Sequence, residues 1–231
     1  MKTTGIIAGV SWESSADYYH IINEEVSRRL GGLHSAKIAM YSVDFAEIET
    51  PLSAGRREEA AAKIVEAGKS IKQAGADFFI ICSNTIGMFT PDVEKATGMP
   101  GIFIADAVGK AVKDKGMKKI ALLGTRFTME EDFYKSVLIN KYGLEPLTPD
   151  AEGRKKVDDI IFKELCVGTI REESKKEYIR IINDLQSQGA EGVALSCTEI
   201  PMLIKQSDVE IPVFDSTAIH SLAAVNMALE D

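Results

Sequence analysis

The chain has 231 residues, enough to bury a sizeable core, and this length leaves one large or two small domains open. A formal net charge of −8 with no basic stripe argues against nucleic-acid binding. The longest apolar runs, such as residues 78–82, are too short to cross a bilayer, and the N-terminus lacks the apolar segment of a signal peptide. We therefore expect a cytoplasmic protein with no membrane partner.

The cysteines and histidines exclude two further classes of protein. Three cysteines without paired spacing do not predict a disulfide framework, and three histidines far apart in sequence give a zinc site little support. No phosphate-binding or dinucleotide-binding glycine motif occurs. We expect no cofactor and no metal.

Short apolar segments alternate along the chain with amphipathic ones. The candidate strands are residues 4–8, 37–43, 78–82, 102–104, 119–123, 192–196 and 213–214. Apolar side chains recur at helical spacing in residues 56–74 and 173–188. Continuously apolar strands that alternate with helices are typical of a parallel sheet covered on both faces, so we predict an α/β fold.

The chain is similar to itself in three places, in the same order and with nearly equal spacing. "GADFFIICSNT" from Gly75 matches "GAEGVALSCTE" from Gly189. "IIAGVSWESSADYY", which contains Gly9 and Tyr19, matches "ALLGTRFTMEEDFY", which contains Gly124 and Tyr134. "MPGIFIADAV" matches "IPVFDSTAIH". We infer two pseudo-symmetric α/β domains, residues 1–100 plus 211–231 and residues 101–210, with the final strand and helix returning to the first.

The repeat predicts which side chain of the first segment faces a ligand. Ser83 aligns with Cys197, and Cys82 aligns with Ser196. Side chains alternate between the two faces of a strand, so if Cys197 faces the site, Ser83 faces it too. We expect Cys82 to point into the packing layers of the sheet.

Parallel sheets bind ligands at the carboxyl ends of their strands, where both segments end. The side chains expected there are Ser83, Asn84 and Thr85 in one half and Cys197, Thr198 and Glu199 in the other. Together they would form an approximately two-fold site around one small molecule, with helix N-termini available for a carboxylate.

At this point a family resemblance is evident. The segments that carry it are "GVSWESS" from Gly9, "GGLHSAK" from Gly31, "YSVDFAEIE" from Tyr41, "GTRFTMEEDFY" from Gly124, "IIFKELCVG" from Ile160, "SCTEIP" from Ser196 and "VFDSTAIH" from Val213. They resemble the cofactor-independent aspartate/glutamate racemases nearly end to end, most closely the bacterial branch specific for L-aspartate and L-glutamate. The resemblance implies two flavodoxin-like halves with the active site in the cleft between them, and a homodimer.

The same resemblance implies roles for individual residues. Family members use one cysteine from each domain, on opposite faces of the substrate Cα, and the second-domain cysteine corresponds to Cys197. Ser83 stands where the first cysteine is usual, although the L-specific branch also carries a small hydroxyl residue there. The histidine that usually follows the asparagine three residues later is replaced by Gly87. The residues expected to bind a small acidic amino acid are Ser11, Asn84, Thr85, Thr125, Thr128, Thr198, Glu199 and His220.

The pairing of Ser83 with Cys197 predicts that proton transfer is faster on one face of the substrate Cα than on the other. A thiol titrates near ~8.5 and exchanges protons in both directions around neutral pH, and a nearby cation or helix N-terminus lowers its pKa further. A serine hydroxyl is a far weaker acid and reprotonates its face of the substrate slowly. In the family the second-domain cysteine deprotonates the L enantiomer, so we predict a preference for L-aspartate or L-glutamate.

Two other interpretations stay open at this stage. Cofactor-free decarboxylases of substituted malonates also resemble this superfamily and keep only the second-domain cysteine, as a proton donor. A catalytically silent ligand-binding protein would explain the changes at Ser83 and Gly87 together. The segments "SWESS", "GLHSAK" and "TRFTMEEDFY" favour the racemase.

Overall fold

The computed structural model describes residues 1–230, which divide into two compact units. The first unit contains residues 1–104 and the C-terminal residues from His220, and the second contains Ala105–Ile219. Both boundaries fall inside helices, α5 (Ile104–Asp114) and α11 (Ser216–Leu229). None of the helices within residues 1–230 is both long and apolar enough to span a membrane.

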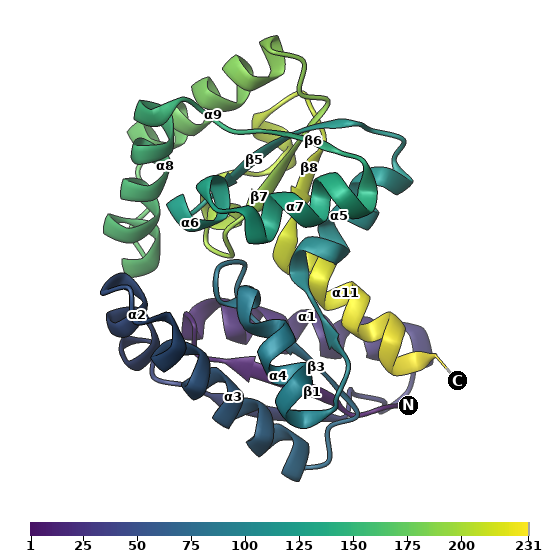
Figure 1. Ribbon diagram of the computed structural model, residues 1–231. Coiled ribbons are helices and arrows are strands. Elements are labelled where there is room, and N and C mark those ends of the chain that lie inside the picture. Colours follow the sequence, from purple (N-terminus) through teal and green to yellow (C-terminus); the bar gives the residue numbers. More distant parts are fainter. Residues whose placement is uncertain (231) are drawn as a thin grey trace. The chain divides into compact units, whose positions relative to one another are not determined.

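The first unit is built on a four-stranded parallel sheet in the order β2-β1-β3-β4. Figure 1 labels its two central strands, β1 and β3. Its elements are β1 (Thr4–Ala8), α1 (Trp12–Leu30), β2 (Ile38–Ser42), α2 (Ala46–Ser53), α3 (Arg57–Gln73), β3 (Phe78–Ile81), the 3-10 turn η1 (Ile86–Phe89), α4 (Thr90–Thr97) and β4 (Gly101–Ile102).

Helices cover both faces of this first sheet. On one face, side chains such as Ile6 and Phe78 pack with Tyr18 of α1 and Val225 of α11 in a single buried cluster. The other face is covered by α3, which contacts β1 and packs against α4. Burial on both faces explains why β1 and β3 are largely apolar: every residue of both strands is buried, and Thr4 is the one polar residue among them.

The second unit repeats this plan, with a parallel sheet in the order β6-β5-β7-β8. Its further elements are β5 (Lys119–Gly124), α6 (Arg126–Glu130), α7 (Asp132–Tyr142), β6 (Glu145–Leu147), α8 (Ala151–Lys163), the 3-10 turn η2 (Leu165–Val167), α9 (Glu172–Ser187), β7 (Gly192–Ser196), α10 (Ile200–Leu203), the 3-10 turn η3 (Gln206–Asp208) and β8 (Val213–Asp215). The same strand order in both units confirms the two similar α/β halves inferred from the repeat.

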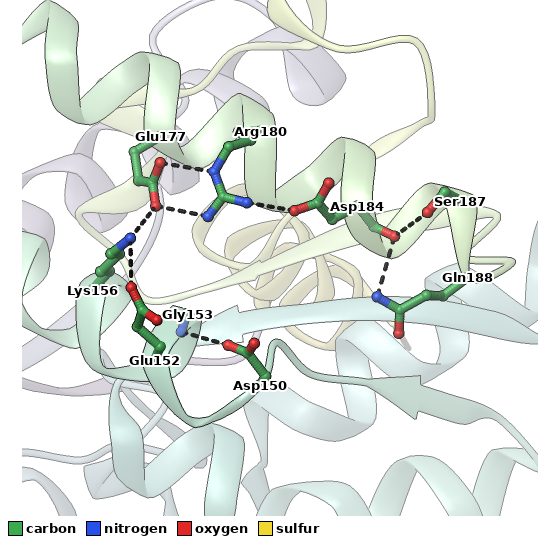
Figure 2. A network of polar contacts seen from close by, with 9 residues as sticks. All are labelled: Asp150, Glu152, Gly153, Lys156, Glu177, Arg180, Asp184, Ser187 and Gln188. Carbon is green, nitrogen blue, oxygen red and sulfur yellow. Dashed lines mark hydrogen bonds and ion pairs between the residues drawn. The ribbon is translucent and has the colours of Figure 1, made fainter.

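Helices α8 and α9 pack together on one face of the second sheet, where Val157, Ile161 and Tyr178 share a cluster with Leu123 and Leu195. One ion pair joins their outer surfaces, and further polar contacts within each helix surround it (Figure 2). Lys156 of α8 lies 3.2 Å from Glu177 of α9, and Arg180 holds the same carboxylate at 2.8 Å. These two cations, Arg180 first, lower the pKa of Glu177 to about 2.

The last strand corrects the predicted domain boundaries. The sequence predicts residues 211–219 in the first domain, but β8 pairs with β7, with Val213 opposite Val193, so these residues belong to the second unit. It also predicts residues 101–104 in the second domain, but Gly101 of β4 pairs with Phe79 of β3, so these residues belong to the first unit. Pro100 and Pro212 each precede the fourth strand of their own sheet, and the third repeated segment reflects that equivalence. Only the helix returns to the first unit, from His220 onwards.

Two smaller corrections concern β6 and a tyrosine pair. Strand β6 was not predicted, because it has three residues and contains Pro146, which an edge position tolerates. The alignment paired Tyr19 with Tyr134, but Tyr19 is 53% exposed, whereas Tyr18 and Tyr134 are both fully buried. The internal tyrosine of the first unit is therefore Tyr18, one residue earlier.

Candidate functional site at the strand ends

Polar side chains follow the two central strands of each sheet at the carboxyl edge. In the second unit, Cys197 follows β7 and Thr125 follows β5, and these strands are neighbours. In the first unit, Ser83 follows β3 and Ser11 lies shortly after β1, again on neighbouring strands. Each unit therefore brings these polar residues to one edge of its sheet, where parallel sheets bind ligands.

Cys197, Thr198 and Glu199 form a compact hydrogen-bonded group after β7. The Cys197 thiol donates to Glu199 Oε2 across 3.1 Å, and the Thr198 hydroxyl donates to the same oxygen across 2.9 Å. Cys197 is 6% exposed and Glu199 5%. The other carboxylate oxygen, Glu199 Oε1, is buried and accepts no hydrogen bond in the structure. A buried carboxylate oxygen is costly to leave without a donor, so it is well placed to accept one from a ligand.

The environment of Cys197 keeps its sulfur protonated. Burial raises the pKa of the Cys197 thiol well above its usual range, and the nearby Glu199 carboxylate raises it further. This direction is opposite to the lowered thiol pKa considered from the sequence. The resting state is a neutral thiol whose proton already points at a carboxylate that can receive it.

The residue before Cys197 fixes the end of β7. The Ser196 hydroxyl donates to the Tyr134 hydroxyl across 3.0 Å, and both side chains are fully buried. Tyr134 lies on α7, so this bond ties the last residue of β7 to a covering helix. Sequence reasoning missed this contact, although the repeat had singled out both residues.

Ser83 has a different environment at the end of β3. The backbone N–H of Ile86 donates to Ser83 Oγ across 3.1 Å, and the N–H of Gly87 donates to the Ser83 carbonyl across 3.1 Å. Ser83 therefore closes the turn that begins η1, and its own hydroxyl proton stays available for donation. Ser83 is 7% exposed, whereas Cys82 is fully buried among apolar side chains, as predicted. Burial also raises the pKa of the Cys82 thiol.

Asn84 and Thr85 continue from Ser83 into the same turn. Asn84 is buried and Thr85 is partly exposed at the N-terminal side of η1. Both therefore lie at the carboxyl edge of the first sheet, where they were expected.

The loop after β1 is unusually constrained. Gly9 has φ +90°, and a Cβ there would lie 2.2 Å from the Val43 carbonyl oxygen, so only glycine fits. Ser11 is the one non-glycine residue of positive φ (71°) within residues 1–230. Its hydroxyl accepts from Ser14 N–H at 3.3 Å and caps α1. Backbone strain of this kind costs about 1–3 kcal/mol and clusters at functional sites.

Thr125 and Thr128 lie after β5 and support each other. The Thr128 N–H donates to Thr125 Oγ1 across 3.4 Å, and the two hydroxyl oxygens are 3.3 Å apart. Thr128 is fully buried, while Thr125 retains slight exposure. Of the two, Thr125 is the better placed to contact a ligand.

His220 does not fit its predicted role in substrate binding. Its Nε2 lies 2.8 Å from the Ile102 carbonyl oxygen and must donate there, so Nδ1 accepts from the Tyr18 hydroxyl at 2.9 Å. The ring is fully buried in the first unit, and this burial lowers the pKa of His220 to about 4. His220 is a neutral core residue that joins α11, α1 and β4.

The chain matches known proteins over its full length. The model of the Asp/Glu/Hydantoin racemase family matches residues 7–224. A structure described as a putative Asp/Glu racemase from Yersinia pestis is 47% identical over 100% of both chains, with a TM-score of 0.94. An aspartate racemase homologue from Pyrococcus horikoshii OT3 is 35% identical over 100% of both chains, with a TM-score of 0.84. The broad specificity amino-acid racemase RacX of Bacillus subtilis (strain 168) is 22% identical over 97% of each chain.

Proposed function

The chain belongs to the Asp/Glu/Hydantoin racemase family, which indicates an amino-acid isomerase, and we propose that it interconverts L- and D-aspartate or L- and D-glutamate without a cofactor. The contact between Cys197 and Glu199 carries the proposal, because it pairs a thiol with a carboxylate that can take its proton. A proton must leave the substrate Cα and another must arrive on the opposite face.

In the proposed first step, the Cys197 thiol proton passes to Glu199 Oε2 while the sulfur takes the α-proton of the L enantiomer. The C–H electron pair stays on the substrate as a carbanion conjugated with its carboxylate. Glu199 ends the step protonated and returns that proton to solvent. The raised pKa of Cys197 makes the transfer to Glu199 necessary, because little thiolate is present beforehand.

In the proposed second step, the Ser83 hydroxyl donates a proton to the other face of the carbanion and is restored from water. Its oxygen already accepts the Ile86 N–H, so the hydroxyl proton is directed elsewhere. A serine hydroxyl is a weak acid and a very poor base in the reverse direction. We therefore infer that the enzyme removes the proton of an L substrate faster than that of a D substrate.

Substrate binding is assigned to the remaining strand-end residues. We propose that the substrate ammonium donates to Glu199 Oε1, the buried oxygen that accepts no hydrogen bond in the structure. Hydroxyl, amide and backbone donors at the strand ends would bind the carboxylates. The residues proposed for this are Ser11, Asn84, Thr85, Thr125, Thr128 and Thr198.

Chiral separation of products tests the proposal directly. Purified protein without added PLP or metal is incubated with each enantiomer of aspartate and glutamate, beside Cys197→Ala as the matched control. We expect D product from an L substrate with the wild-type protein only. Carbon dioxide release from a substituted malonate, with no change in any amino acid, would instead support the decarboxylase interpretation.

A further inference from the structure

In the first unit, the Phe103 ring fills the space that a side chain at position 87 would need. Gly87 is buried in η1, and a Cβ at this position would lie 2.9 Å from Phe103 Cε2 and 3.2 Å from Phe103 Cδ2. A side chain at position 87 therefore cannot be added while the ring stays in place. The resemblance predicts a histidine at position 87, and the aromatic ring of Phe103 stands where that side chain would begin.

The ring lies close to the end of β3. Phe103 directly follows β4, whose Ile102 pairs with Ile80 of β3, so Phe103 is level with the last residues of β3. Gly87 N–H donates to the Ser83 carbonyl across 3.1 Å, and the Thr90 hydroxyl donates to the Gly87 carbonyl across 2.8 Å. These two bonds fix the backbone that the ring touches, and Phe103 itself is only partly buried.

The second unit shows that this position does not require an aromatic residue. Asp215 pairs with Leu195 of β7 and is the counterpart of Phe103 at the end of the fourth strand. Its carboxylate accepts the N–H groups of Thr217 and Ala218 at 2.9 and 3.2 Å, at the start of α11. A short polar residue is therefore sufficient for the connection between the fourth strand and the following helix. The presence of an aromatic ring at this position in the first unit needs a different explanation.

We propose that Phe103 is a specificity-determining residue whose ring limits the length of the amino-acid side chain accepted beside Ser83. This inference rests on the proposed racemase function. The ring is apolar, partly exposed and held against a rigid turn, so it forms a wall that cannot hydrogen bond. One methylene group beside such a wall changes kcat/KM by roughly 10-fold to 200-fold. The wall therefore discriminates among acidic amino acids by chain length.

The test compares the variants Phe103→Ala and Phe103→Leu with the wild-type protein on three L substrates: aspartate, glutamate and 2-aminoadipate, which differ by one methylene group each. The rate measured is Cα–H exchange in D2O, reported as kcat/KM for each substrate. Phe162→Ala is the control, because Phe162 is an exposed phenylalanine on α8 of the second unit.

We expect Phe103→Ala to raise the ratio of kcat/KM for glutamate over aspartate by about 10-fold or more, with a further gain for 2-aminoadipate and a smaller shift in Phe103→Leu. Phe162→Ala leaves the ratios unchanged. If Phe103→Ala fails to fold, the Phe103→Leu ratios decide. Equal losses on all three substrates would make the ring a structural residue and overturn this inference alone. No exchange by the wild-type protein on any of the three would overturn the proposed function and this inference together.

Discussion

The ends of β3 and β7 occupy equivalent places in two sheets of the same topology, yet the residues that follow them form different hydrogen bonds. After β7, a thiol and a hydroxyl both donate to one buried carboxylate oxygen. After β3, the serine hydroxyl accepts a backbone N–H and completes a turn. The first arrangement places the Cys197 thiol beside a carboxylate that can accept its proton. The second positions only the Ser83 hydroxyl, which is a weak proton donor.

This difference teaches that a repeated fold preserves the direction of its side chains more strictly than the chemical groups that those side chains carry. Ser83 and Cys197 are slightly exposed, while Cys82 and Ser196, one residue earlier, are fully buried. The alternation of the strand thus presents the same position to the carboxyl edge in both units. What each position can do depends on the next two residues, which are Asn84 and Thr85 in one unit and Thr198 and Glu199 in the other.

The largest expected effect comes from removing the carboxylate that distinguishes the β7 end. Glu199→Gln keeps the size of the side chain but cannot take the thiol proton, so we expect Cα–H exchange to fall by about 10²–10⁴-fold. The variant should also lower the pKa of Cys197, because the carboxylate raises it, although burial continues to hold it high. The pH dependence of Cys197 alkylation measures this shift.

Glu172→Gln, at the exposed start of α9, is the matched control for that experiment. It should leave both the exchange rate and the alkylation profile unchanged. An active Glu199→Gln enzyme would show that Cys197 loses its proton by another route.

The second prediction concerns His220, which the sequence placed in the site and the structure places in the core. The folded protein keeps His220 neutral to about pH 4, whereas an unfolded histidine takes a proton near pH 6.5. The stabilisation is therefore complete above pH 6.5 and declines as the pH falls towards 4, by up to about 3 kcal/mol. Urea unfolding of His220→Gln and wild type at pH 7 and pH 4.5 should show this dependence in the wild type only.

His20→Gln is the control, because His20 is exposed on α1, where it lies 3.2 Å from the Glu24 carboxylate. It should follow the wild-type dependence on pH. A catalytic role for His220 would instead appear as a kinetic pKa that disappears in His220→Gln, and that result would restore the original assignment.

A third prediction separates the two steps at the β3 end. Ser83→Ala removes the proposed donor but leaves Cys197 in place, so conversion of L to D substrate should fall by about 10-fold while Cα–H exchange on the L substrate falls less. Chiral analysis and proton NMR on the same samples give the two rates. An equal fall in both would mean that Ser83 acts before the carbanion forms.

The smallest effect is expected at the surface network of α8 and α9. Glu177→Gln removes the carboxylate held by Arg180 and Lys156, and because these partners are partly exposed we expect a loss of at most about 1 kcal/mol at pH 7. The pKa of Glu177 is lowered from 4.5 to about 2, so this stabilisation is present above pH 4.5 and disappears as the pH falls through that range.

Urea unfolding of Glu177→Gln and wild type at pH 7 and pH 3 measures that difference, with Glu173→Gln, at an exposed position on the same helix, as the control. A difference as large at pH 3 as at pH 7 would contradict the ion-pair explanation. Neither variant should change catalysis, because the network lies on helices rather than at a strand end.

Much of the fold follows from local patterns. Covering helices bury both faces of each sheet, so the sequence predicts the central strands β1, β3, β5 and β7 from their apolar runs and the helices α3 and α9 from their helical spacing. It does not predict strand β6, because a three-residue edge strand with a proline has almost no periodicity. The assignment of β8 failed because sequence similarity shows that two segments are equivalent but not which sheet each joins.

At the candidate site, the directions of the side chains were predictable from the sequence, but their protonation states were not. The regular alternation of a strand predicted Cys82 inside the packing layers, and the structure buries it while Ser83 and Cys197 remain slightly exposed. The protonation of Cys197 depends on burial and on the position of Glu199 Oε2, which no spacing reveals. The contact between Gly87 and Phe103 joins residues separated by a helix and a strand, so only the folded chain shows it.

The central claim is that Cys197, assisted by Glu199, is the group that removes the α-proton of an L amino acid. Proton NMR in D2O, without PLP or metal, follows the Cα–H signal of L- and D-aspartate and L- and D-glutamate with wild type and Cys197→Ala. We predict faster loss of the signal from an L substrate than from its D enantiomer, and none with Cys197→Ala. Faster exchange of the D form, or exchange that survives in Cys197→Ala, would contradict the account.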